Sequence, residues 1–225
     1  LVLSAQAEEN LRGAIKAVET RDLKLAREVT ARDVEIDRME VELEEECLKI
    51  LALHQPVAGD LRFIVAILKI NNDLERVGDL ANNIAGQAKT LARLPEVPPP
   101  FDLHEMATAA WGMVGDSLDA VVELNAMKAE QVRAFDRTLD RIHKQNCTHL
   151  EELIHEHPES IAAYIAYLNV SRSLERIGDH ATNVAEDVIY LMQGEIVRHD
   201  RQRSARKEGQ PTVSVSLETS EEERV

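Results

Sequence analysis

The sequence has few of the residues that mark several common protein classes. Of 225 residues, two are cysteine, nine are glycine, seven are proline and 3% are aromatic. Two cysteines, Cys47 and Cys147, are too few for a disulfide scaffold or a zinc cluster of paired cysteines, which favours a reducing compartment. So little glycine and proline argues against a turn-rich all-β fold. No apolar run approaches the ~20 residues of a membrane-spanning helix, so we expect no direct membrane insertion.

Negative charge outweighs positive charge. The chain has 26 Lys and Arg against 41 Asp and Glu, a net charge of −15. Because nucleic-acid binding depends on phosphate neutralisation by Lys and Arg, we expect no nucleic-acid partner. An acidic protein is suited instead to cations or to basic protein surfaces. The chain begins at Leu1 rather than Met, so we expect its N-terminus to be incomplete.

The sequence contains an internal repeat. Residues 73–85 (DLERVGDLANNIA) and residues 173–185 (SLERIGDHATNVA) match at eight of thirteen positions at a constant offset of 100. Upstream, RDVEIDRME and FDRTLDRIH correspond at an offset of 103. The change of offset from 103 to 100 falls in the link between the second and third helices of each half, which is longer in the first half. Such self-similarity indicates a duplication.

Each half has the apolar periodicity of three helices. We expect helices at 5–20, 22–53, 58–93, 102–126, 128–155 and 158–193. The proline-rich run 95–101 cannot continue a helix and is predicted to be a hinge. The fold class is therefore all-α, with two pseudo-symmetric three-helix bundles. The two bundles span residues 1–94 and 102–195. The polar tail, 196–225, has too little apolar surface to bury in a fold and is expected to be disordered.

Pairs of acidic residues lie four positions apart, on one face of the second, third, fifth and sixth predicted helices. Stacked like charges cost an isolated helix a few tenths of a kcal/mol. Glycine inside two of these helices costs about 1 kcal/mol each, which predicts that a neighbouring helix approaches closely. Carboxylates beside such a contact have to be paired, protonated or bound to metal. The four pairs are Asp33/Asp37, Glu75/Asp79, Asp136/Asp140 and Glu175/Asp179.

Two interpretations of these rows remain open. A row of carboxylates is commonly a solvated helix face, and it can present charge to a basic partner. A cluster of oxygen donors also suits iron, manganese, magnesium or calcium. Arg76 and Arg176 directly follow the glutamates, about 100° round the helix, so we expect them to serve another helix. His180 lies off the main row, and we expect it not to be a ligand.

Other candidate chemistry is weak. Glu152 and His155 have the Glu-x-x-His spacing of di-iron bundles, which need the motif twice; it occurs once, so we interpret it as coincidence. No glycine-rich nucleotide-binding motif or nucleophile–base constellation is present. The two cysteines are expected to be small core residues.

Three segments together resemble the PhoU family, over about residues 5–195. They are QPVAGDLR at 55–62, NNDLERVGDLANNIA at 71–85 and SRSLERIGDHATNVAEDVIYLMQGE at 171–195. The resemblance implies two three-helix bundles and multinuclear iron or zinc clusters held by the E/D-x-x-x-D motifs. Carried over by position, the metal ligands are Asp33, Asp37, Glu75, Asp79, Asp136, Asp140, Glu175 and Asp179, with Asn83, Asn183 and Asp187 as accessory residues.

The resemblance also implies a function. PhoU-type proteins are negative regulators of phosphate uptake and of phosphate-starvation signalling. We therefore expect an adaptor rather than an enzyme. The expected partners of this adaptor are the ATPase subunit of the phosphate ABC transporter and a sensor histidine kinase. We expect a cytoplasmic homodimer, recruited by these partners to the inner face of the membrane. The alternatives are an iron store and a di-iron oxidase.

Overall fold

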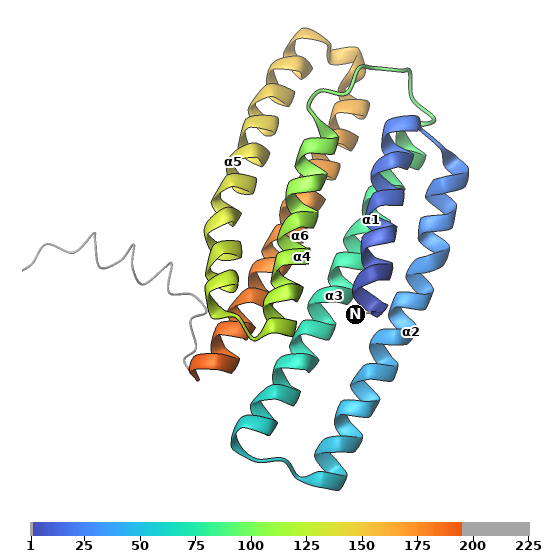
Figure 1. Ribbon diagram of the computed structural model, residues 1–225. Helices are drawn as coiled ribbons and strands as arrows, with labels where there is room; N and C mark the ends of the chain where they lie inside the picture. Colours follow the sequence, from blue (N-terminus) through green and yellow to red (C-terminus); the bar gives the residue numbers. More distant parts are fainter. Residues whose placement is uncertain (1, 195–225) are drawn as a thin grey trace, which may run out of the picture.

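The computed structural model describes residues 2–194, which form six α-helices and no strand (Figure 1). The predicted all-α fold is confirmed. Residue 195 and the predicted tail, 196–225, lie outside the described residues. The helices are α1 (Val2–Thr20), α2 (Leu23–His54), α3 (Ala58–Leu91), α4 (Leu103–Glu123), α5 (Ala126–Glu156) and α6 (Ile161–Gln193), with a 3₁₀ turn, η1 (Pro158–Ser160), before α6.

Local sequence explains where these helices begin and end. Asp22, Asp102 and Asn125 accept hydrogen bonds from backbone N–H groups in the first turns of α2, α4 and α5, which satisfies donors that a helix leaves unpaired. The helix predicted over 102–126 ends at Glu123 instead. Leu124 has a left-handed φ of 48° and Asn125 already caps α5.

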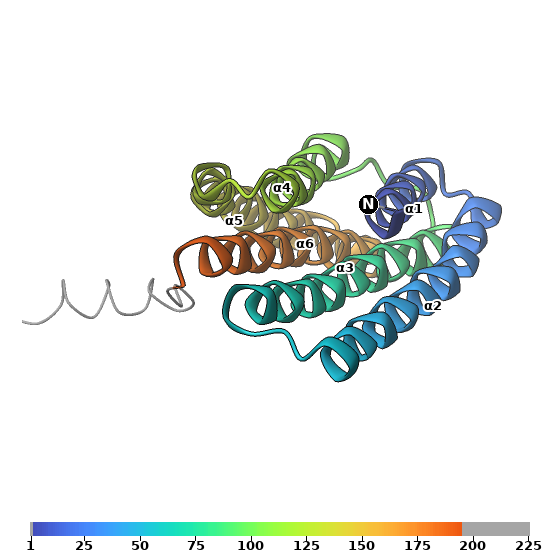
Figure 2. The ribbon, with the colours of Figure 1, turned by 60° about the horizontal axis from the view of Figure 1, so that its bottom comes forward.

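The helices form two three-helix bundles that are joined along α3 and α6 (Figures 1 and 2). Helices α1 to α3 make one bundle and α4 to α6 the other. Their buried side chains, mostly Ala, Leu, Val and Ile, form one continuous apolar cluster through both bundles. Helices α3 and α6 carry the duplicated motif, so the two copies lie side by side at the centre of the molecule.

The proline-rich link between α3 and α4 is held in place by one arginine. Nη1 of Arg21 donates hydrogen bonds to the backbone oxygens of Leu91, Leu94 and Pro95, at 3.2 to 3.3 Å. The last carbonyl of α3 and two carbonyls of the link are therefore satisfied by a side chain from the α1–α2 turn.

Two helical glycines allow close contact between helices. A Cβ on Gly78 would lie 3.1 Å from Ile36 Cγ2 and 3.3 Å from Asp33 Oδ1, both on α2. A Cβ on Gly178 would overlap Leu139 Cδ2 on α5. The close approach predicted from these glycines is confirmed. It brings the acidic row of α3 against α2, and that of α6 against α5.

Over the described residues, no helix combines the length and the apolar character that a bilayer-spanning segment requires.

Candidate metal centres

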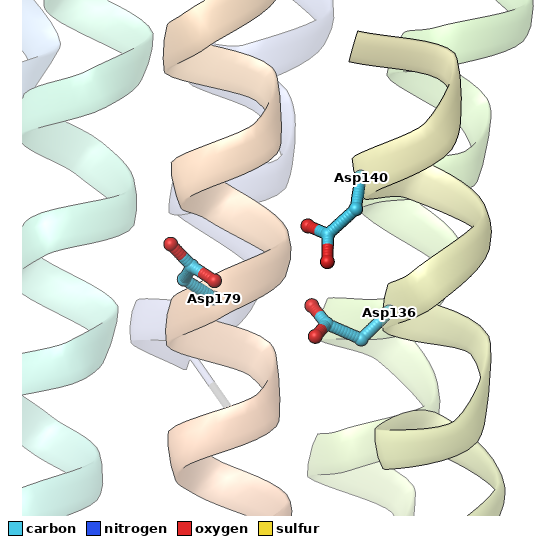
Figure 3. Close-up of side chains that lie close together, drawn as sticks. All are labelled: Asp136, Asp140 and Asp179. Atoms are coloured by element: carbon cyan, nitrogen blue, oxygen red, sulfur yellow. The ribbon is translucent and has the colours of Figure 1, made fainter. Parts of the chain in front are cut away.

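Three carboxylates converge in the second bundle. Asp136 and Asp140 stand one turn apart on α5 and point toward Asp179 on α6 (Figure 3). Each contributes an oxygen, and these oxygens lie within 4.8 Å of one another. Asp136 is buried, whereas Asp140 and Asp179 are exposed. We call these three residues the second-bundle cluster; it is open on one side, which would let a cation enter.

The carboxylates of the second bundle repel one another. Burial, followed by the charges of Glu175, Asp136 and Asp140, raises the pKa of Asp179 to about 6. Burial also raises the pKa of Glu175, and the charges of Asp140 and Asp136 raise it further. The four predicted ligands of this bundle therefore interact with one another, and a cation among them would relieve the repulsion.

The first bundle repeats the arrangement in a looser form. Burial, Asp37 and Asp79 raise the pKa of Asp33, against a hydrogen bond from Asn82 that lowers it. Burial and Asp79 raise the pKa of Glu75. Asp33 Oδ1 is buried and has no hydrogen-bond partner, which leaves one oxygen free for a metal. Among residues 2–194, however, a group of three potential ligands within 4.8 Å forms only in the second bundle.

The ion pairs of Arg76 differ from those expected from the sequence. Its Nη1 lies 3.0 Å from Asp79 Oδ2, and its Nε lies 3.4 Å from Glu75 Oε2. The expectation that it would serve another helix is met only in part: its ion pairs lie within α3, although its charge also acts on the carboxyl of Glu40 on α2. It neutralises part of the charge of the first-bundle row.

Two of the three accessory candidates pair with residues of α3. Asn83 is exposed on α3. Asn183 donates to Asp73 Oδ1 at 3.2 Å. Asp187 is 1% exposed and pairs with Lys69 Nζ at 3.2 Å. Asn183 and Asp187 therefore connect α6 to α3.

Sequence reasoning missed Asn82. Its Nδ2 donates to Asp33 Oδ2 at 2.7 Å, and its Oδ1 accepts from Thr30 Oγ1 at 2.9 Å. The signal was present: Asn82 lies one turn after Gly78, on the face that α2 approaches. Asn82, rather than Asn83, orients the buried carboxylate of the first bundle.

A cavity of about 970 Å³ runs between α3 and α6, beside the second-bundle cluster. Asp136 and Asp179 line it together with His180. His180 Nδ1 lies 2.8 Å from Asp73 Oδ1 on α3. His180 thus links the two repeats through its Nδ1 atom.

The structure also shows where the Glu-x-x-His motif and the two cysteines lie. Glu152 and His155 are exposed on α5. Cys47 is buried as predicted, but Cys147 is only half-buried, so its assignment to the core is wrong; its Sγ faces the His143 ring instead.

The donor set fits a divalent cation. The second bundle offers carboxylate oxygens from two helices, and the first offers a buried unpaired oxygen at Asp33. Oxygen ligands of this kind suit hard or borderline metals.

Comparisons with known proteins agree with the repeat. The PhoU domain family matches residues 2–88 and 103–188, one match in each bundle. The PhoU homologue of Pseudomonas putida is 40% identical over 200 residues, covering 88% of this chain and 78% of that protein. The homologue of Aquifex aeolicus is 40% identical over 192 residues, covering 85% and 87%.

Solved structures show the same fold. The crystal structure of PhoU from Pseudomonas aeruginosa superposes with a TM-score of 0.83 at 38% identity, covering 87% of this chain and 94% of that one. The phosphate transport system regulatory protein PhoU from Streptococcus pneumoniae gives a TM-score of 0.80 at 29% identity, covering 87% and 92%. With family matches in both bundles and relatives aligned over most of its length, the chain belongs to the PhoU family.

Proposed function

We propose that this protein is an accessory regulator of phosphate transport that represses phosphate uptake and starvation signalling when phosphate is abundant. The observation that carries the proposal is the match to relatives named phosphate-specific transport system accessory proteins, over both bundles and at up to 40% identity. In this proposal the chain acts as a cytoplasmic, non-enzymatic adaptor. Its partners are the ATPase subunit of the phosphate transporter and a sensor histidine kinase.

A gene deletion tests the regulatory part. Removing the gene should switch on phosphate-scavenging genes in phosphate-rich medium, and restoring it should switch them off again. Unchanged expression in the deletion strain would contradict the proposal. Binding of the purified protein to the isolated ATPase subunit and kinase, with an unrelated ATPase as control, tests the adaptor role, and sedimentation of the same sample tests the homodimer.

We further propose that the acidic rows bind iron or zinc as a structural link between helices. Asp136, Asp140, Glu175 and Asp179 would hold metal between α5 and α6, and Asp33, Asp37, Glu75 and Asp79 would hold it between α2 and α3. The support is the convergence in the second bundle and the pKa of Asp179, raised to about 6 by burial and its acidic neighbours. Bound metal would neutralise this charge and stabilise the folded bundle.

Elemental analysis of untagged protein, purified without chelators, tests the metal proposal. The wild type should contain stoichiometric iron or zinc, and the Asp136→Asn/Asp140→Asn and Glu75→Ala/Asp79→Ala variants should each lose the metal of one bundle. Metal that is absent from the wild type, or unchanged in both variants, would make the rows a protein-facing surface. In that case the double variants should weaken binding to the ATPase or kinase while stability is retained.

A further inference from the structure

Helix α2 carries a row of aliphatic side chains on the face that points away from its bundle. Val34, Val41 and Leu48 are 69%, 50% and 52% exposed. They lie seven residues apart, so they stand within about 20° of their neighbours around the helix and span about 21 Å along it. Single exposed aliphatic residues are normal on a protein surface, whereas these three form a regular apolar stripe. We call them the α2 row.

Packing of the first bundle does not account for the α2 row. Over the described residues, α2 packs only against α1 and α3. The buried residues of α2, such as Val29 and Ile36, lie on a different face of the helix. Both views place α2 at the outer edge of the molecule (Figures 1 and 2). The α2 row is therefore not needed to bury the core and is open to a partner.

The duplicated helix provides an internal comparison. At the offset of 103 that relates the two bundles, the three positions of the α2 row correspond to Arg137, Lys144 and Glu151 on α5. All three residues are exposed. The second bundle therefore forms with charged side chains where the first has aliphatic ones. The fold does not require the α2 row, which indicates that it serves a contact outside the fold.

The exposed face of α2 has the pattern of one strand of a coiled coil. Its positions alternate in steps of three and four, like the a and d positions of a heptad repeat. The pattern runs through Ala31, Val34, Arg38, Val41, Glu45, Leu48 and Ala52, all of which are exposed. The α2 row fills the d positions, and alanine or a charged residue fills each a position. Charged residues at a positions fix the register of a partner at some cost in stability, so the pattern predicts one partner helix of about three heptads.

The charge of α2 selects the kind of helix that it can bind. Residues 31–52 contain eight acidic and three basic residues, against four and three in residues 134–155 of α5. Arg38 is already engaged by two glutamates of its own helix. Glu44 and Glu45 are exposed beside the α2 row. A helix with Lys or Arg beside its apolar residues complements this charge, whereas a second copy of α2 or an anionic membrane is repelled by it.

We propose that the outer face of α2 binds an amphipathic helix of another protein, with aliphatic residues at heptad spacing and Lys or Arg on either side of them. The α2 row packs against the aliphatic residues of that helix, and the acidic residues of α2 attract its basic flanks. The α2 row contains none of the metal ligands proposed above, and the interaction does not depend on the regulatory function.

A designed peptide is the probe for the test, with the whole chain as its target. The peptide has three heptads, with Leu at a and d and Lys at e and g. A second peptide has the same composition in scrambled order, and a third has Glu in place of Lys. Fluorescence anisotropy should show binding of the first peptide alone. Its binding should weaken at higher salt, because salt screens the attraction between the flanking charges.

Variants of α2 separate the apolar contribution from the charge. Val34→Gln/Val41→Gln/Leu48→Gln removes the α2 row without changing charge, and Gln is a good helix former. This variant should bind the Lys peptide at least about 10-fold more weakly, because three apolar side chains no longer become buried. Glu44→Gln/Glu45→Gln should weaken binding by about 3-fold or more at low salt.

The matched control changes the duplicated positions of α5. Arg137→Gln/Lys144→Gln/Glu151→Gln should bind the Lys peptide as the wild type does, and circular dichroism verifies that every variant is folded. The proposal would be overturned by wild type that does not bind the Lys peptide, by equal binding of the scrambled peptide, or by equal effects of the α2 and α5 triple variants. Sedimentation that shows a wild-type dimer and a monomeric α2 triple variant would also overturn it, because the α2 row would then bind a second copy.

Discussion

Replacing Asp179 by Asn should stabilise the metal-free protein while removing a metal ligand. Burial and three neighbouring carboxylates raise the pKa of Asp179 from 3.8 to about 6. At about 1.36 kcal/mol per pKa unit, this corresponds to about 3 kcal/mol of unfavourable free energy at neutral pH before screening. Because Asp179 is exposed, water screens much of the repulsion. We expect Asp179→Asn to raise the free energy of unfolding by about 1 kcal/mol and Tm by about 2–4 °C.

The pH dependence of this effect has a definite sign. The folded-state pKa of Asp179 is above its unfolded value, so the unfavourable term is fully present above pH 6. It is relieved as the pH falls from about 6 through 3.8, and well below 3.8 the carboxyl is protonated in both states. The advantage of Asp179→Asn over the wild type should therefore be largest at about pH 7–8, small at about pH 4 and absent near about pH 3. Urea unfolding with a chelator present, at several pH values, measures it.

Metal should reverse the order of stability. A ligand at 100 times its Kd stabilises the folded state by about 2.7 kcal/mol, which exceeds the gain from the substitution. The wild type should then melt above Asp179→Asn. Asp60→Asn, in the first turn of α3, is the control and should change stability by less than about 0.5 kcal/mol under both conditions. A variant that is less stable than the wild type in chelator, or an advantage independent of pH, would refute the reasoning.

Three further predictions concern the packing that positions the site. Gly178→Ala should destabilise the protein by about 1–2 kcal/mol, because the added methyl group overlaps α5. Gly86→Ala has open space around it and should stabilise the protein by up to about 1 kcal/mol. Thermal unfolding of both variants tests this, and equal effects would contradict it. Lys69→Met should cost about 1–3 kcal/mol, because the buried Asp187 carboxylate loses a charged hydrogen-bond donor from α3; unchanged urea unfolding would count against the ion pair. Asn82→Ala removes a donor from a buried carboxylate and should cost about 1–3 kcal/mol; a neutral result would show that water replaces the amide.

The helices were predicted well because they depend on interactions between residues that are close in sequence. Apolar periodicity and capping residues such as Asp22 and Asp102 act within one helix, so the helices could be placed to within a few residues. The main error in helix bounds, the end of α4, arose where Leu124 adopts a left-handed conformation. Asn82 was missed because its role depends on the approach of α2.

The duplication, the all-α class and the rows of carboxylates follow from the order of residues alone, because a repeat and a helical face are both defined by spacing along the chain. Which rows converge depends on how the helices pack. Asp136, Asp140 and Asp179 meet because Gly178 lets α6 pack closely against α5. In the first bundle Arg76 pairs with Asp79 of its own row. Distances between carboxylates on different helices depend on such packing, which spacing within one helix does not specify.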